Sequence, residues 1–116
     1  MPKSAVNLAT ELLRRPKASL EDLEIHQFED DAAAHDDVVM EQLHADFESK
    51  FEREQSELSA RYGKPSRTGD DDDEVIPLCG VGRFAIWSVE GKLLYLALAH
   101  EDRECPILLM LGTVLR

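Results

Sequence analysis

The stretch 84–111, FAIWSVEGKLLYLALAHEDRECPILLML, decides the fold. Its apolar residues are mostly Ile, Leu, Val, Phe, Tyr and Trp, and they predict three β-strands, at 84–89, 92–100 and 105–111. Glu90-Gly91 separates the first two and offers Gly for the positive φ of a tight turn. A polar loop at 101–104 separates the last two. Strands joined by loops this short must be antiparallel.

Two of these strands lack the alternation of apolar and polar residues that a half-exposed strand shows. Residues 93–99 and 107–111 are apolar throughout, so both faces of the sheet are predicted to be covered. A long helix can cover one face. The other face needs a further cover: a helix at 4–15, a second copy of the chain, or a partner protein.

The long helix is predicted over 38–62, with Asp36 or Asp37 as its N-cap and Gly63 as its stop. One stripe at the helical repeat is apolar except for Glu54. Its apolar members are Met40, Leu43, Phe47, Phe51, Leu58 and Tyr62.

The remaining segments give weaker patterns. Residues 4–15 predict a short helix that Ser4 caps and Pro16 ends. Residues 20–28 fit a helix or a short strand, and the sequence leaves both open. Residues 75–79 predict a short edge strand, and Gly80-Val81-Gly82 predicts a bulge or tight bend after it.

Together these patterns predict an α+β fold in which one long amphipathic helix packs on a three- or four-stranded antiparallel meander. The length of 116 residues allows one domain. Its expected parts are a helical or irregular N-terminal segment, the long helix, an acidic linker and the sheet, at 1–35, 36–63, 64–74 and 75–116.

Acidic residues dominate the charge, with 24 of them against 13 basic residues and a net charge of −11. Residues 19–57 hold most of the excess, because only Lys50 and Arg53 oppose the acids there. Such a field repels nucleic acid and anionic lipid, which need a basic footprint. It attracts a basic protein surface instead.

Cys79 and Cys105 are too few for a disulfide scaffold or a zinc site, and we expect them to be reduced. Whether they lie close enough to bridge stays open. The first residues lead into no apolar run of the kind a signal peptide needs, and the longest apolar run is too short to span a membrane. We therefore expect a cytoplasmic protein.

No motif predicts catalysis, a metal or a cofactor. The four histidines form no His-x-x-x-His pair. The acidic run 70–74 lacks the alternating ligands of a calcium loop. The loop 100–104 gathers titratable groups without a recognisable nucleophile. Gly80 and Gly82 lack the companions of a phosphate-binding loop.

These observations favour a binding module for a basic protein partner, one that blocks or escorts it as an immunity, inhibitor or chaperone-type protein would. The candidate partner-binding residues are Asp46, Glu48, Glu52, Asp70, Asp71, Asp72, Asp73, Trp87, Glu101 and Asp102.

Two alternatives remain. The predicted helix would be roughly 37 Å long, whereas a strand of about seven residues spans about 23 Å. The helix should then overhang the sheet and expose Met40, Leu43 and Phe47, which suggests a self-assembling homodimer. The second alternative is a small enzyme or metal-binding protein that uses the loop 100–104.

Overall fold

The structure is a computed structural model that describes residues 4–28, 34–102 and 104–115. Two long helices, α1 and α3, and five strands account for most of these residues. Their bounds are α1 Ala5–Arg14, β1 Ser19–His26, α3 Asp37–Tyr62, β2 Arg67–Gly69, β3 Val81–Val89, β4 Lys92–Ala99 and β5 Ile107–Leu115.

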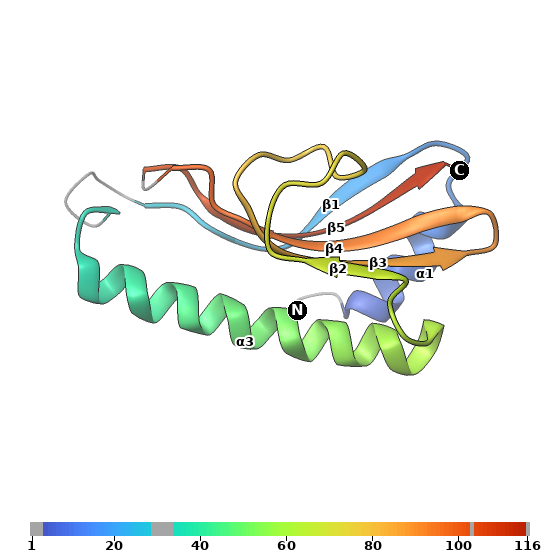
Figure 1. The fold of residues 1–116 in the computed structure, drawn as a ribbon, viewed down its shortest axis with the longest axis horizontal. Helices are drawn as coiled ribbons and strands as arrows, with labels where there is room; N and C mark the ends of the chain where they lie inside the picture. Colours follow the sequence, from blue (N-terminus) through green and yellow to red (C-terminus); the bar gives the residue numbers. More distant parts are fainter. Residues whose placement is uncertain (1–3, 29–33, 103, 116) are drawn as a thin grey trace.

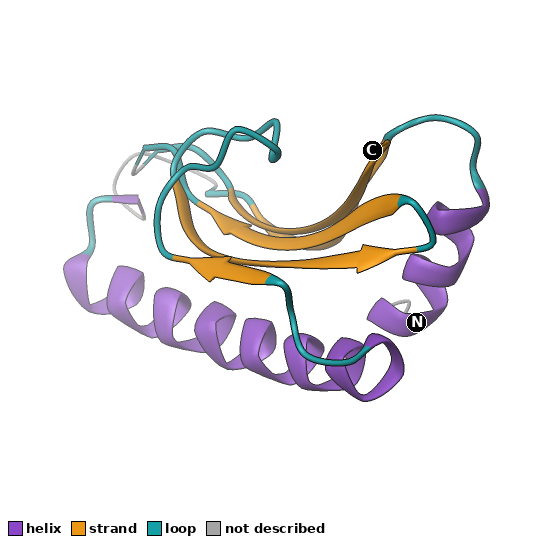
Figure 2. Ribbon diagram, turned by 45° about the vertical axis from the view of Figure 1, so that its right-hand side comes forward, coloured by secondary structure: helices purple, strands orange, loops and turns teal. Residues whose placement is uncertain are grey.

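The strands form one antiparallel sheet in the order β1-β5-β4-β3-β2. Figures 1 and 2 show that the sheet is curved, that both helices lie on one side of it, and that the loop between β2 and β3 lies on the other. The predicted α+β class and the helix-on-sheet arrangement are thus confirmed, with five strands in place of three or four.

Helix α3 begins and ends where its caps require. The Asp36 carboxylate accepts hydrogen bonds from the backbone N–H groups of Val38 and Val39, both at 3.1 Å, which satisfies two donors of the first turn. At the other end Gly63 adopts a φ of 88°, a conformation that favours glycine. Five residues of the predicted stripe are buried: Met40, Phe47, Phe51, Glu54 and Leu58.

The β3–β4 hairpin also follows its local sequence. Glu90 and Gly91 have φ of 48° and 81°, the pair of positive values that a two-residue turn of the primed type needs. Gly82 lies at a register shift in the pairing of β3 with β4, which is the predicted bulge. It sits beside Gly80, whose φ is 70°.

Three segments differ from, or extend, the sequence predictions. Residues 19–26 form β1, which settles the helix-or-strand alternative in favour of a strand. The expected strand at 75–79 is wrong, because these residues form turns and loop; Pro77 there has no N–H to donate to a ladder. The edge strand beside β3 is β2 instead, which is only three residues long and too short to produce a periodic pattern.

Apolar side chains fill both faces of the sheet. Helices α1 and α3 cover one face, where they share a buried cluster with Trp87, Leu96 and Leu109. The second face carries a smaller cluster around Tyr95 and Ile86, into which Ile76 of the β2–β3 loop packs. Both faces of β4 are therefore covered, as its uniformly apolar sequence predicts.

The expected overhang of the long helix is not found. Met40 and Phe47 are only 8% and 2% exposed and belong to the same cluster as Leu98 and Ile107, and Leu43 packs against that cluster. The chain itself covers these side chains, because the core extends beneath the ends of β4 and β5. They therefore offer no open oligomer interface.

Candidate protein-binding site

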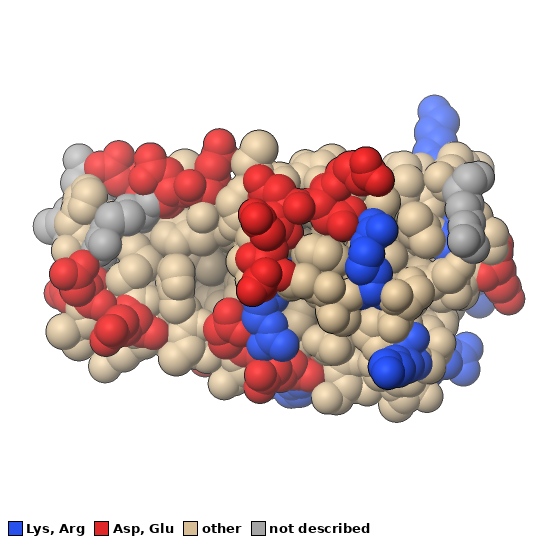
Figure 3. Space-filling model, viewed as in Figure 1, with Lys and Arg blue, Asp and Glu red and all other residues tan. Residues whose placement is uncertain are grey.

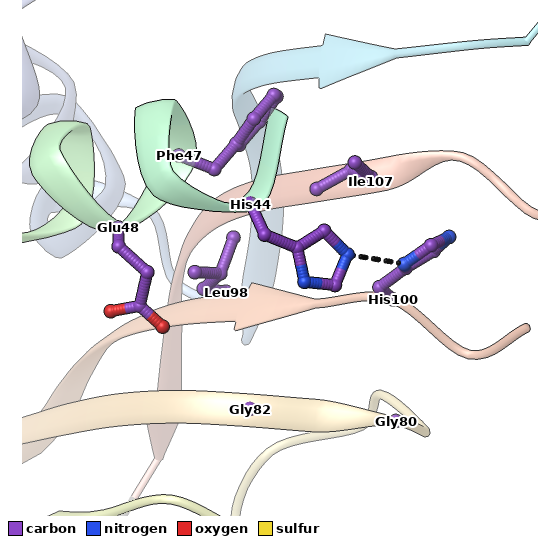
Figure 4. Close-up of a pocket in the computed structure, with 8 residues that line it drawn as sticks. All are labelled: His44, Phe47, Glu48, Gly80, Gly82, Leu98, His100 and Ile107. Carbon is purple, nitrogen blue, oxygen red and sulfur yellow. Dashed lines mark hydrogen bonds between the residues drawn. The ribbon is translucent and has the colours of Figure 1, made fainter. Parts of the chain in front are cut away.

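A pocket of about 130 Å³ opens where the first half of α3 meets one end of the sheet. Phe47, Leu98 and Ile107 supply apolar walls, and Glu48 supplies a carboxylate. Figure 4 shows His44 and His100 at one side of it, with the backbone of β3 below. Ligand pockets for whole metabolites are usually about 300–1,000 Å³, so this pocket has the size of a single side chain.

Two glycines line this pocket, Gly80 just before β3 and Gly82 within it. Gly80 is pressed against the next loop, since its carbonyl accepts a hydrogen bond from the His100 N–H at 2.9 Å and an added Cβ would lie 2.5 Å from the Glu101 Cα. Gly82 has room: a Cβ there would meet only the Leu98 carbonyl oxygen, at 3.9 Å. Because Gly82 lines the pocket, a larger residue there would add a side chain at the pocket wall without a backbone clash.

His44 of α3 and His100 after β4 form the histidine pair. Nε2 of His44 and Nδ1 of His100 are 2.9 Å apart, and the two rings meet edge to face. A hydrogen bond between two ring nitrogens requires one of them to be an unprotonated acceptor. The pair therefore carries at most one positive charge while this bond exists. Phe28 packs against the His100 ring, with the centroids 6.0 Å apart.

Arg83 of β3 lies directly beside the pocket and is bound by α3. Its Nη1 donates to Glu48 at 2.8 Å and to Glu52 at 3.1 Å. Its guanidinium lies 4.7 Å from the centre of the Phe51 ring, within the range of a cation–π contact. Hydrogen bonding to Glu48 raises the pKa of Arg83 above its usual value, so Arg83 stays charged. We call Phe51, Glu48 and Glu52 the Arg83 cradle.

Acidic side chains surround this part of the surface. Figure 3 shows them at the left and centre of the face, on both sides of a paler region, while most Lys and Arg side chains lie in the right half. Glu48 and Glu52 come from α3, and Asp72 and Glu101 come from the loops beside Gly80. Four of the predicted partner-binding residues are thus brought together.

Several predicted residues have internal partners. Asp72 accepts a hydrogen bond from the Val81 N–H at 2.9 Å, and Asp73 binds Arg67 at 2.8 Å. Asp46 pairs with Lys50 at 2.9 Å. Asp70 and Asp71 are exposed on the same loop, and Asp102 is exposed beside Glu101. Within the predicted acidic linker, Asp72 and Asp73 thus accept internal hydrogen bonds, whereas Asp70 and Asp71 are exposed.

Trp87 must be removed from the predicted binding surface. It is 1% exposed and lies in the core between sheet and helices. Its indole N–H donates to the Gly63 carbonyl at 2.8 Å, at the end of α3. Neither the ring surface nor the indole N–H is accessible to a partner protein. Trp87 instead links β3 to the end of α3.

Sequence reasoning missed His44 and Gly82 as members of a site, and it considered His100 only as part of the loop 100–104. Only the spacing of His44, Phe47 and Glu48 along one side of a helix could have pointed to them. Nothing local indicates that His100, far along the chain, meets His44. Nothing in the local sequence of the predicted loop site, 100–104, indicates this contact with α3 either. Arg103 of that loop lies outside the described residues.

A second candidate surface lies on the other face of the sheet. A groove of about 310 Å³ runs between β1 and the β2–β3 loop, and its lining includes Leu20, Val75, Tyr95 and Val114. Leu20, Val75 and Val114 are only partly buried. The β2–β3 loop thus covers this face in part and leaves an apolar strip beside it.

Over the described parts of the chain, no three His, Cys, Asp or Glu side chains are placed to hold a metal ion together. Cys79 and Cys105 are both free thiols. Among the helices of those same parts, none combines the length and the apolar character needed to cross a membrane. Comparison of the chain with protein-family models, with curated proteins and with solved structures gave no match.

Proposed function

We propose that this protein is a binding module for a basic protein partner. The observation that carries the proposal is the convergence of acidic side chains from α3 and from two loops around one apolar pocket. Protein interfaces concentrate their binding free energy in a few anchor side chains that enter such pockets. An acidic rim adds a preference for a basic surface.

The distribution of charge supports the same role. The chain has a net charge of −11. On the face drawn in Figure 3, acidic side chains gather in the left half and centre, whereas most Lys and Arg side chains lie in the right half. This asymmetry would orient an approaching basic protein and speed its association at low salt. Binding of this kind weakens as salt rises, because exposed charges are screened.

Affinity capture with matched variants tests the proposal. The loss variant neutralises three of the candidate partner-binding acids, one from α3 and one from each of two loops, and combines Glu52→Gln, Asp70→Asn and Glu101→Gln. The control neutralises three exposed acids elsewhere and combines Asp22→Asn, Glu57→Gln and Glu90→Gln. Both have the same net charge, so a general electrostatic effect cancels between them.

We expect the wild-type protein and the control to retain one basic protein at equal stoichiometry, and the loss variant to lose it. The retained protein should elute as salt is raised, and the purified pair should bind again in calorimetry. Equal retention by all three proteins, or no stoichiometric basic partner at low salt, would refute the proposal.

Self-assembly is a second candidate function, and the apolar groove between β1 and the β2–β3 loop supports it. A second copy of the chain would bury Leu20, Val75 and Val114 there. Leu20→Glu would place a charge on this surface. Light scattering on the wild type and on Leu20→Glu tests self-assembly. A wild-type dimer that the substitution converts to a monomer would support it, and a wild type that stays monomeric at all concentrations would refute it.

A further inference from the structure

We infer that the pocket between His44 and Gly82 receives an arginine side chain of the partner. This inference rests on the proposed function and specifies its anchor. It is drawn from the Arg83 cradle, in which the protein already binds one guanidinium on the same side of α3. The pocket lies next to that cradle, one helical turn nearer the start of α3.

The two places share a repeat of four residues along the helix. The cradle consists of an aromatic ring at 51 and carboxylates at 48 and 52. Four residues earlier stand an aromatic ring at 47 and a polar pair at 44 and 48. Residues four apart occupy the same side of a helix. The pocket therefore shares the residue spacing of the cradle, with His44 in the position of the first carboxylate. The Phe47 ring already has Lys50 Nζ 5.2 Å from its centre.

The cradle is filled by β3 and the pocket is not. Arg83 projects from β3 into the cradle, whereas the neighbouring Gly82 and Gly80 project nothing. Both glycines line the pocket of about 130 Å³ and neither places a side chain in it. An incoming side chain would lie beside Arg83 and along the apolar walls that Leu98 and Ile107 provide. The long stem of Arg suits such walls, because its methylene groups can be buried while its charged end stays polar.

The carboxylate that lines the pocket, Glu48, can accept a further hydrogen bond from a guanidinium although it already binds Arg83. Glu48 binds Arg83 through Oε2 alone, and a carboxylate can accept hydrogen bonds at both oxygens. The hydrogen bond between His44 and His100 limits this pair to one positive charge at most. When both rings are neutral, Glu48 and Glu52 are the negative charges next to the pocket. A planar guanidinium can also stack on an imidazole ring, which an ammonium group does less well. The geometry thus favours Arg over Lys.

Titration with small peptides, followed by NMR of the full chain, tests the inference. The probes are acetyl-Gly-Xaa-Gly-amide peptides in which Xaa is arginine, lysine or citrulline. Citrulline keeps the shape of arginine and removes its charge. We expect the arginine peptide to shift the resonances of His44, Gly80 and Gly82 saturably. Its affinity should exceed that of the citrulline peptide at least tenfold and that of the lysine peptide about threefold, in line with the weaker fit of an ammonium group.

Gly82→Leu fills the pocket and should abolish the shifts, while Glu57→Gln, elsewhere on α3, should change nothing. The spectrum of Gly82→Leu reports whether it folds. If it does not fold, Glu48→Gln takes its place and should weaken arginine binding at least fivefold. Equal binding of the citrulline peptide, or arginine binding that survives the filled pocket, would overturn the inference.

The inference and the proposed function can fail separately. A basic partner that binds wild type and Gly82→Leu with equal affinity would preserve the binding role and exclude this pocket as its anchor. Arginine binding in the pocket without any captured partner would support the pocket and count against the role.

Discussion

At the scale of single residues, Tyr95 shows how tightly the second face of the sheet is packed. Tyr95 is 1% exposed, and its ring lies over Gly112 of β5, its cross-strand neighbour. A Cβ at Gly112 would be 2.3 Å from the ring and 2.9 Å from the Ser19 carbonyl. Only glycine fits between them. Burial raises the pKa of Tyr95 to about 12 from 10.0.

This shift predicts how stability depends on pH. The folded protein holds the phenol proton more tightly than the unfolded chain. The contribution of Tyr95 to the free energy of unfolding is therefore complete below pH 10 and is lost as pH rises towards 12. Between pH 9 and pH 11 the wild type should lose about 1 kcal/mol more unfolding free energy than Tyr95→Phe. Urea unfolding of both proteins at the two pH values measures it, and parallel losses would contradict the assigned pKa.

Residue-level prediction from sequence succeeded where the cause is local. Ser4, Asp36 and Gly63 act as the caps their identities suggest, and Glu90-Gly91 makes the turn that its glycine favours. It failed for Trp87, because a large aromatic residue suits a core and an interface equally well. Only its distance from solvent distinguishes the two, and that is a property of the folded chain.

At the scale of elements, Lys92 joins the sheet to α1. Its Nζ donates to the carbonyl oxygens of Leu13 and Arg15, both at 2.7 Å. These carbonyls lie at the end of α1, where helical carbonyls lack partners within the helix and a positive charge is favourable. The first residue of β4 thus caps a helix far away in the sequence.

Lys92→Met keeps the length of the side chain and removes its donors. We expect it to lower the free energy of unfolding by about 1.5–3 kcal/mol, the usual range for hydrogen bonds to a charged group. Lys64→Met, at an exposed position, is the matched control and should change little. Urea unfolding measures both. Equal stability of Lys92→Met and Lys64→Met would show that the contact of Lys92 with the end of α1 contributes nothing to the free energy of unfolding.

Element-level prediction succeeded for α1, α3 and the three strands that follow position 80. It failed for the cover of the second face, for which we considered a helix, a copy or a partner. The cover includes the irregular segment around Ile76, which is 4% exposed. A loop has no periodicity, so its apolar residues gave no sign of the face they would occupy. The pocket was missed for a related reason, since the residues that line it come from four elements, α3, β3, β4 and β5.

At the scale of the whole molecule, net repulsion should outweigh the ion pairs. Arg83, Lys50 and Arg67 are paired with acids, but 24 acidic residues face only 13 basic ones. Most exposed pairs contribute less than about 1 kcal/mol each. The excess charge acts on the entire molecule and disfavours its compact state.

We therefore expect the melting temperature to rise as NaCl is increased from about 10 mM to about 0.5 M, a range over which the Debye length falls from about 30 Å to a few ångströms. Circular dichroism follows the transition, and sodium chloride avoids the additional stabilisation that sulfate produces. A falling melting temperature would mean that the ion pairs, including the Arg83 cradle, dominate the electrostatics.

The order of strands in the sheet has a consequence for biosynthesis. Among the described strands, β1 pairs with β5 and with no other, with Ser19 opposite Thr113. The first strand to be synthesised therefore pairs only after the last one has been made. Translation must pass through α3 and the β3–β4 hairpin before β1 acquires a neighbour. A nascent chain arrested before Ile107 would lack an inner strand of the sheet, and its apolar hairpin would need shielding by chaperones.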